Sequence, residues 1–284
     1  MKSSKKNSSL LMFKFFIVKI ILFFGQNTIL GRGKLRRALV YLINLFIPSG
    51  NQFKARFTCY VKNVPFKFYN DDLTGIKFYF GRNEVREIEF IKKNSPHNSV
   101  FIDIGANMGL YTQNIANLNS KNRRVKIIAI EPNPINCNRL KENIMLLKYK
   151  IKDINKLVKI KRCAVGNINK KGILNFSNGL ANGYISNNKK DDHSIFIDCK
   201  KLYDIVNEEN LSYITNLKID IEGYEDKALI PFFHKAKKSL FPKNILIEHS
   251  GKQFWENDLI KFLFKLGYKK VFKNKSNLAL TLKI

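Results

Sequence analysis

Apolar and polar residues are patterned differently in three successive parts of the chain. The first part contains two nearly continuous apolar runs, Leu10 to Phe24 and Ala38 to Pro48, which indicate helices. From Phe53 to Phe80, apolar and polar residues alternate instead, a pattern typical of short strands. We therefore expect three segments: basic, apolar helices over residues 1–50, a β-rich lead-in with a helix over residues 51–96, and a main domain over residues 97–284.

The third part alternates short β-rich apolar runs with helical segments. The sequence predicts strands at Ser99 to Ile104, Val125 to Glu131, Leu157 to Val165, Asn216 to Ile221 and Asn244 to His249. Its last two runs, YKKVFKN and LALTLKI, indicate an antiparallel pair. This alternation predicts an α/β fold with a mainly parallel sheet, which binds ligands outside the carboxyl ends of its strands. The polar, strand-like segment from Gly172 to Cys199 is expected to be a separate β excursion.

The chain is strongly basic, with 51 Lys and Arg against 22 Asp and Glu and a formal net charge of +29. A field of this sign attracts nucleic acid, anionic membranes or acidic substrates. Because Lys, Asn and Ile are abundant along the whole chain, a biased composition explains much of the excess equally well. The four cysteines lie far apart without Cys-x-x-Cys spacing, so we expect a reducing, cytoplasmic compartment with neither a zinc site nor a disulfide framework.

The positive charge is most concentrated ahead of Asp71, the first acidic residue. The run from Leu10 to Phe24 has 15 residues, fewer than the roughly 20 of a spanning helix, and its two lysines offset most of the apolar gain. No signal-peptide cleavage site follows it. We therefore expect residues 1–50 to lie on an anionic membrane surface at its inner face, with GRGKLRR toward the headgroups. The alternative is that both helices pack on the main domain as an apolar cap.

A glycine-rich turn in VFIDIGANMGLYT follows the first predicted strand of the main domain. Such a turn lets the backbone approach a ligand, and the next helix points free N–H groups at it. No lysine follows Gly109, which argues against a nucleoside triphosphate cradle. The side chain of Asn107, in the middle of GANMG, would crowd a pyrophosphate. The carboxylate of Asp103 disfavours phosphate but suits the α-ammonium group of S-adenosylmethionine.

The next strand, in IIAIEPNP, ends in Glu131, 22 residues beyond Gly109. A carboxylate there can accept hydrogen bonds from both ribose hydroxyls of a bound nucleoside. Alone, each motif is weak, because a glycine turn can also serve tight packing. Together and in this order, the two motifs predict S-adenosylmethionine as the cofactor.

Four motifs in this order, DIGANMGLYT, IEPNP, LKIDIEGYE and ILIE, resemble the signatures of the FkbM family of S-adenosylmethionine-dependent methyltransferases. The resemblance covers about residues 78–249 but is poor over 166–199, where the substrate pocket is expected. It implies a Rossmann-like, seven-stranded methyltransferase sheet with an antiparallel last strand, and methyl transfer to a hydroxyl of a sugar, glycan or secondary metabolite. It also implies two groups of site residues: Asp103, Gly105, Asn107, Gly109 and Glu131 around the cofactor, and Asp220 and Glu222 at the end of the fourth strand.

Methyl transfer to oxygen is an in-line displacement that needs alignment and a base for the hydroxyl proton. Asp220 and Glu222 are two residues apart and would share one side of an extended strand. One of them can orient the methionine ammonium and the other can act as the base, and the sequence does not divide these roles. His249, at the end of the fifth strand, is the competing base, and Glu248 beside it is expected on the opposite face.

Other polar residues are expected to have no catalytic role. We expect Tyr224, Glu225 and His234 on a helix surface. The adjacent side chains of Asp191, Asp192 and His193 diverge from one another, so no metal site is expected there.

Two other classes of function compete with this interpretation. The positive charge favours a nucleic-acid methyltransferase, but Asp220-Ile-Glu-Gly stands where base-nitrogen enzymes carry an Asn/Asp-Pro-Pro-aromatic turn, so we consider nucleic acid an improbable partner. A non-catalytic, membrane-associated protein could keep the cofactor fold, although the intact carboxylates argue against it. A nicotinamide oxidoreductase fits least, because of the glycine pattern.

Overall fold

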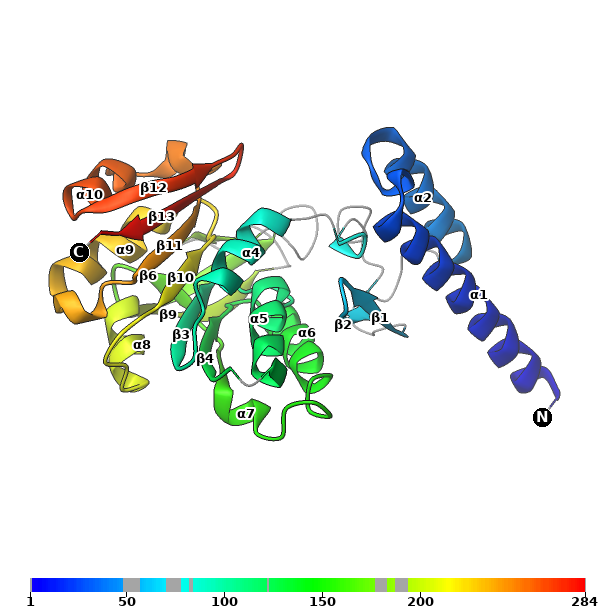
Figure 1. The fold of residues 1–284 in the computed structure, drawn as a ribbon. Coiled ribbons are helices and arrows are strands. Elements are labelled where there is room, and N and C mark those ends of the chain that lie inside the picture. The colour runs from blue at the N-terminus through cyan, green and yellow to red at the C-terminus, as the bar shows by residue number, and fades with distance from the viewer. Residues whose placement is uncertain are drawn as a thin grey trace. The chain divides into compact units, whose positions relative to one another are not determined.

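The computed structural model describes residues 2–47, 57–69, 78–81, 84–121, 123–176, 183–186 and 194–283. The chain forms two compact units, Met1–Val85 and Arg86–Ile284, whose elements are labelled in Figure 1. The division of the sequence at residues 50 and 96 stays a prediction.

The N-terminal unit combines a helical hairpin with a β-hairpin. Its elements are α1 (Lys2–Asn27), the short helix η1 (Ile29–Gly31), α2 (Gly33–Phe46), β1 (Phe57–Val61) and β2 (Val64–Phe68). Strands β1 and β2 pair antiparallel across Lys62 and Asn63, whose φ values of 49° and 66° suit a tight two-residue turn. The Gln26 side-chain amide donates to the carbonyl oxygens of Tyr60 and Tyr79, each at 2.7 Å, and so fastens the end of α1 to this hairpin.

Helix α1 is longer than the apolar run in its sequence. By length and composition alone, Ser9–Asn27 could cross a membrane. One side of the helix is occupied within the unit, because Val18 and Leu22 are buried and the Phe15 ring lies 5.3 Å from that of Phe57. Its other sides expose large apolar side chains, at Leu10, Leu11, Met12, Phe13, Phe16, Ile20, Phe23 and Phe24.

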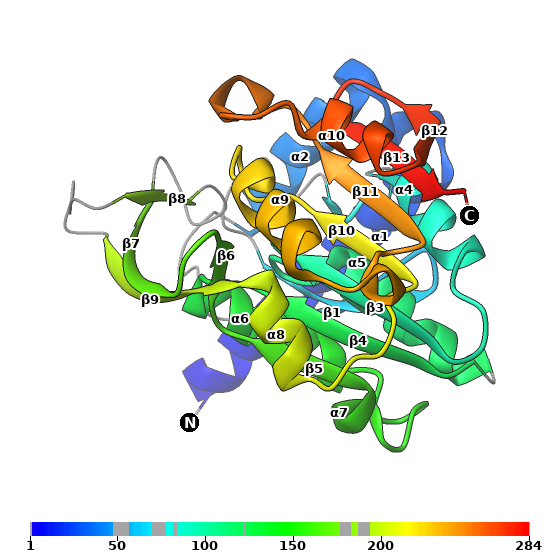
Figure 2. The ribbon, with the colours of Figure 1, turned by 90° about the vertical axis from the view of Figure 1, so that its left-hand side faces the viewer.

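A seven-stranded sheet forms the middle of the second unit, as the sequence predicted. Its strands are β3 (Ser99–Ile104), β4 (Val125–Ile130), β5 (Val158–Lys161), β10 (Asn216–Ile219), β11 (Asn244–Glu248), β12 (Tyr268–Lys273) and β13 (Asn277–Leu282). They lie in the order β12-β13-β11-β10-β3-β4-β5. Strand β13 is antiparallel to both of its neighbours, and the other pairings are parallel. The predicted α/β fold with an antiparallel last strand is confirmed (Figure 2).

Helices cover both faces of this sheet because its strands are apolar on both sides. The helices are α4 (Val85–Lys93), α5 (Leu110–Ala116), α6 (Pro134–Met145), α7 (Ile154–Leu157), α8 (Leu202–Glu208), α9 (Glu225–Lys235) and α10 (Leu259–Lys265), with short turns η2 (Asn117–Lys121), η3 (Lys238–Leu240) and η4 (Lys252–Phe254). On one face, Ile102 and Ile128 pack with α8, α9 and α10. On the other face, Phe101 and Ile127 pack with α4, α5 and α6.

The segment expected as a β excursion forms a second sheet. Its strands are β6 (Ala164–Gly166), β7 (Lys170–Phe176), β8 (Gly183–Ser186) and β9 (Ile195–Lys201), in the order β6-β9-β7-β8. Strand β7 is antiparallel to β8 and β9, whereas β6 and β9 are parallel. Figure 2 shows it to one side of the main sheet.

Candidate active site

The order of the main sheet locates a crevice before any side chain is considered. Strands β3 and β10 are neighbours in the sheet. The chain continues from β3 to β4 and β5 on one side of this pair, and from β10 to β11 on the other side, so the strand order reverses between them. In open α/β sheets, the ligand crevice lies outside the carboxyl ends of the strands at such a reversal point. The predicted site residues at the ends of β3, β4 and β10 all belong to this edge of the sheet.

The turn between β3 and α5 depends on glycine at two positions. Gly105 has a φ of +74°, and a Cβ on it would lie 1.9 Å from the backbone oxygen of Asp220. Gly109 has a φ of +96°, and its Cβ would lie 2.5 Å from Leu140. Asn107, between them, also has a left-handed backbone, with a φ of 50°. The turn is therefore wedged between the end of β10 and helix α6, and a side chain at either glycine would push it out of place.

Glu131, the residue directly after β4, binds the backbone of this turn through its carboxylate. It is 6% exposed; its Oε2 accepts from the backbone N–H of Asn107 at 2.8 Å, and its Oε1 from that of Asn133 at 2.9 Å. Burial raises the pKa of Glu131 to about 7, against the lowering effect of these N–H groups. Because a carboxylate has about four acceptor sites, both oxygens can still accept from a ligand hydroxyl.

Asp103 is fully buried and is fixed from the opposite end of the same turn. Its Oδ2 accepts from the backbone N–H of Thr112 at 3.1 Å and from the Thr112 hydroxyl at 2.6 Å. Its Oδ1 has no hydrogen bond within the described part of the chain. Burial raises the pKa of Asp103, and the ammonium of Lys218 opposes this rise. Asp103 and Glu131 thus flank one turn: Glu131 accepts from its backbone at Asn107, and Asp103 accepts from Thr112 in the helix that follows the turn.

Lys218 of β10 is a site residue that the sequence interpretation missed. Its ammonium donates to the backbone oxygen of Gly105 at 2.8 Å, and it lies 3.6 Å from a carboxylate oxygen of both Asp103 and Asp220. The side chain is 7% exposed. Alternation along a strand could have found it, because Lys218 shares a side with Asp220 and is the one charged residue within the strand.

The turn after β10 departs from the extended chain that was expected. The strand ends at Ile219, and Glu222 and Gly223 have left-handed φ values of 56° and 97°. Asp220 is half-buried and Glu222 is exposed. Partial desolvation, followed by the carboxylates of Asp220 and Glu225, raises the pKa of Glu222. Because the chain is no longer extended at Glu222, the expectation that its side chain shares one side of a strand with Asp220 does not apply.

Glu225 holds this turn and is fully buried, so its expected place on a helix surface was wrong. Its Oε1 accepts from the backbone N–H groups of Ile221 and Gly223 at 2.9 and 3.2 Å, and its Oε2 accepts from the Trp255 indole N–H at 2.7 Å. Tyr224, the residue before α9, is half-buried, and His234 is exposed.

Glu248, rather than His249, is the residue of β11 whose side chain faces the carboxylates of the turn. Burial first, and then the charges of Asp220, Glu225 and Glu222, raise the pKa of Glu248 to about 7, against the lowering effect of the Ser250 N–H group. Its Oε1 accepts from that N–H at 3.0 Å, whereas its buried Oε2 has no partner among the described residues. Alternation was expected to leave His249 near Asp220 and Glu248 on the opposite face unless the turn rotated it inward, whereas the structure has Glu248 near Asp220.

His249 lies against the hairpin of β12 and β13 instead. It is 6% exposed, and its backbone N–H donates to the Ser276 carbonyl at 2.7 Å. Burial lowers the pKa of His249, and the charges of Lys273 and Lys252 lower it further. A neutral imidazole in this place faces lysines rather than the carboxylate group.

The crevice carries negative charge although the protein is strongly basic. Asp103, Glu131, Asp220 and Glu222 lie around it with Glu248, and Lys218 is the ammonium closest to them in the described contacts. This local field favours a cationic ligand. Among the described residues, no group of three or more His, Cys, Asp or Glu is placed to hold a metal ion. Residues 191–193, which were considered as metal ligands, lie outside the described part.

Comparison with known proteins agrees with this fold. The family model of the methyltransferase FkbM domain matches residues 103–270. No curated protein matches the chain.

Several solved structures resemble the chain at low sequence identity. A methyltransferase FkbM from Methylobacillus flagellatus is 15% identical with a TM-score of 0.48, over 72% of this chain and 52% of that one. This chain thus spans about half the length of that protein. A candidate methyltransferase from Streptococcus mutans, in complex with SAH, is 11% identical with a TM-score of 0.42, over 70% and 97%. A human methyltransferase 10 domain containing protein is 15% identical with a TM-score of 0.41, over 70% and 81%.

Proposed function

The chain belongs to the FkbM methyltransferase family, and from this premise we propose that it transfers a methyl group to a hydroxyl oxygen of a sugar, glycan or secondary metabolite. S-adenosylmethionine is the methyl donor. The observation that carries the oxygen-directed chemistry is the half-buried carboxylate of Glu248, whose pKa is about 7 and whose buried Oε2 has no hydrogen-bond partner in the described structure. A base with a pKa near the working pH removes a hydroxyl proton efficiently.

The residues at the crevice fit the cofactor. Glu131 keeps acceptor capacity for the two ribose hydroxyls, and Asp103 has a buried oxygen without a hydrogen bond. Gly105 brings the backbone of the turn against Asp220 with no side chain between. The cofactor supplies a methyl group on a cationic sulfur, and the surrounding carboxylates stabilise that charge.

The remaining carboxylates divide the acceptor chemistry between them. The carboxylate of Asp220 lies 3.6 Å from the Lys218 ammonium, and this position suits it to orient a hydroxyl or ammonium group. We assign the base role to Glu248, with Glu222 at the exposed mouth of the crevice. Glu248 would take the proton of the acceptor hydroxyl, and the bound cofactor would supply the methyl group to that oxygen and keep the electrons of the broken C–S bond on its sulfur.

Calorimetry with S-adenosylmethionine and turnover with labelled cofactor test this proposal together. Glu131→Ala should weaken cofactor binding, whereas Asp220→Ala and Glu222→Ala should retain binding and lose turnover. The acceptor is found by incubating enzyme and labelled cofactor with a lysate separated into lipid, polysaccharide, small-molecule and RNA pools. An absence of binding heat would remove the enzymatic function, and label in RNA alone would favour the nucleic-acid alternative.

We also propose that residues 1–50 hold the protein at the inner, cytoplasmic face of an anionic membrane. The support is the exposed apolar surface of α1, together with exposed cations at Arg32, Lys34 and Arg37 beside it in the chain. Because Gln26 and Phe15 fasten one side of α1 to the β-hairpin, we infer that the helix lies in the membrane surface rather than crossing it.

Sedimentation with vesicles tests this membrane proposal in the full-length protein. Phe13→Ser, Phe16→Ser and Phe23→Ser together should abolish binding to vesicles that contain anionic lipid. Phe196→Ser, at a site that is 76% exposed in the other unit, is the matched control. Equal binding by both variants would contradict the proposal.

A further inference from the structure

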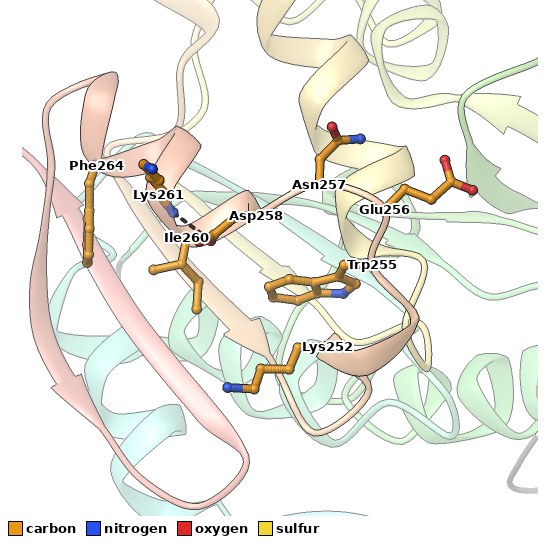
Figure 3. Close-up of a pocket in the computed structure, with 8 residues that line it drawn as sticks. All are labelled: Lys252, Trp255, Glu256, Asn257, Asp258, Ile260, Lys261 and Phe264. Atoms are coloured by element: carbon orange, nitrogen blue, oxygen red, sulfur yellow. Dashed lines mark hydrogen bonds between the residues drawn. The ribbon is translucent and has the colours of Figure 1, made fainter.

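A second hollow of the catalytic unit lies after β11, outside the predicted cofactor residues. Its volume is about 570 Å³, within the range of small-molecule sites. Eight residues from η4, α10 and the segment between them line it: Lys252, Trp255, Glu256, Asn257, Asp258, Ile260, Lys261 and Phe264. Figure 3 shows the Trp255 ring at its centre, with Ile260 and Lys252 on neighbouring sides. We call it the Trp255 pocket.

The Trp255 pocket is joined to the candidate active site through a single carboxylate. Glu225 accepts from the Trp255 indole N–H at 2.7 Å with one oxygen and from the Gly223 N–H at 3.2 Å with the other. The indole is therefore fixed in orientation by the same side chain that shapes the turn carrying Glu222. A molecule seated on Trp255 lies next to that turn.

The Trp255 pocket keeps an excess of positive charge, because Lys252 and Lys261 face only one carboxylate, Asp258, that is not paired with a lysine. Asp258 caps α10 and accepts from the Lys261 backbone N–H at 2.9 Å, and Glu256 pairs with Lys227 at 2.9 Å. No described carboxylate forms an ion pair with the ammonium of Lys252 or Lys261. Two ammonium groups and one carboxylate, Asp258, thus line a hollow that also contains a half-buried indole and the Asn257 amide, which leaves a net positive charge for an anionic ligand.

We propose that the Trp255 pocket binds an anionic sugar ring of the methyl acceptor, an assignment that rests on the proposed methyltransferase function. The apolar face of a sugar ring packs against a flat, rigid indole, and its hydroxyls find the Asn257 amide. A carboxylate or phosphate on the ring meets Lys252 and Lys261. The pocket then acts as an acceptor subsite that positions a neighbouring hydroxyl at the carboxylates of the crevice.

Trp255 is the only tryptophan of the chain, so its fluorescence reports on this pocket alone. The full-length protein is titrated with glucose, glucuronic acid and glucose 6-phosphate at constant ionic strength. The two anionic sugars should change the emission saturably and at concentrations at least tenfold lower than glucose. Comparison of glucuronic acid with glucose 6-phosphate shows which anionic group is preferred. No saturable change with any of the three, or an equal response to all, overturns the proposal.

Two lysine variants and a matched control locate the effect. Lys252→Ala and Lys261→Ala should each raise the half-saturating concentration of the anionic sugars several-fold, whereas Lys269→Ala, at an exposed position of β12, should leave it unchanged. Calorimetry with S-adenosylmethionine should give the same affinity for all three variants. If the cofactor binds and the sugars do not, this inference fails and the proposed function stands; if the sugars bind and the cofactor does not, the proposed function fails.

Discussion

The two units of this protein use the same apolar residues in opposite ways. In the N-terminal unit, α1 presents Phe13, Phe16 and Phe23 to the outside, each more than half exposed. In the catalytic unit, strands and helices of similar composition bury residues such as Phe101 and Phe232 almost completely. A large exposed apolar area marks a surface for a partner or a membrane. Large apolar side chains are therefore mostly buried in the catalytic unit, whereas those on the outer sides of α1 stay exposed.

The units differ in charge in a related way. The exposed apolar side chains of the first unit are accompanied by cations with no acidic residue before Asp71. The catalytic unit concentrates carboxylates in one crevice around a single buried lysine, Lys218. The net charge of +29 therefore does not describe the candidate active site, where carboxylates outnumber the one buried lysine. Four experiments test what each unit does with its charged and apolar groups.

The largest effect is expected from the base in the acidic crevice. Glu248→Gln keeps the shape of the side chain but cannot take the hydroxyl proton, so kcat should fall about 10²–10⁴-fold. His249→Gln should change kcat far less, because its side chain lies at the β12–β13 hairpin. Steady-state kinetics of both variants with the identified acceptor measure this difference. A larger loss in the histidine variant would return the base role to His249.

The next effect concerns stability and the one cation in the crevice. Lys218→Met leaves the buried carboxylate of Asp103 without its compensating charge, which should lower the free energy of unfolding by about 3–5 kcal/mol. Adding Asp103→Asn removes that charge and should recover part of the loss. Urea unfolding of the two single variants and the double variant forms the cycle. Strictly additive losses would show that the two side chains do not interact.

Substituting one phenylalanine in each unit compares how much a buried and an exposed ring contribute to stability. Phe232→Ala removes a ring that is 1% exposed and packs between α9 and the sheet, and it should cost about 3–5 kcal/mol. Phe16→Ala, at a ring that is 60% exposed, should change stability by less than about 0.5 kcal/mol. Thermal unfolding without membranes measures both. A large loss at Phe16 would mean that it is part of a core rather than a binding surface.

The sequence predicted this fold, and the strand-end positions of Asp103 and Glu131, better than it predicted the turn after β10. Local sequence patterns predict the strands. Because parallel strands end at the same edge of a sheet, they also predict that Asp103 and Glu131 lie near one another. The turn after β10 does not extend a strand, because Glu222 has a φ of 56°, so alternation failed for its side chain. The burial of Glu225 goes with its hydrogen bond to the distant residue Trp255, which no local pattern encodes.

The smallest expected effect is a pH dependence of stability at Glu131. Its pKa is about 7 in the folded protein and about 4.5 when unperturbed, so between these values the folded state holds a proton that the unfolded state has released. Stability contributed by the protonated side chain is complete below pH 4.5, falls as the pH rises, and is lost above pH 7. The total change is at most about 3 kcal/mol, at 1.36 kcal/mol per unit.

Glu131→Gln isolates this contribution, because the amide has the same shape and does not titrate. The wild-type protein should therefore lose stability relative to Glu131→Gln when urea unfolding at pH 5 is compared with unfolding at pH 8. A constant difference between the two proteins across this range would show that Glu131 has an ordinary pKa. The same ionisation should improve binding of S-adenosylmethionine as the pH rises through 7, because only the carboxylate accepts from both ribose hydroxyls. The crevice thus loses folding stability over the same pH window in which it becomes able to bind its cofactor.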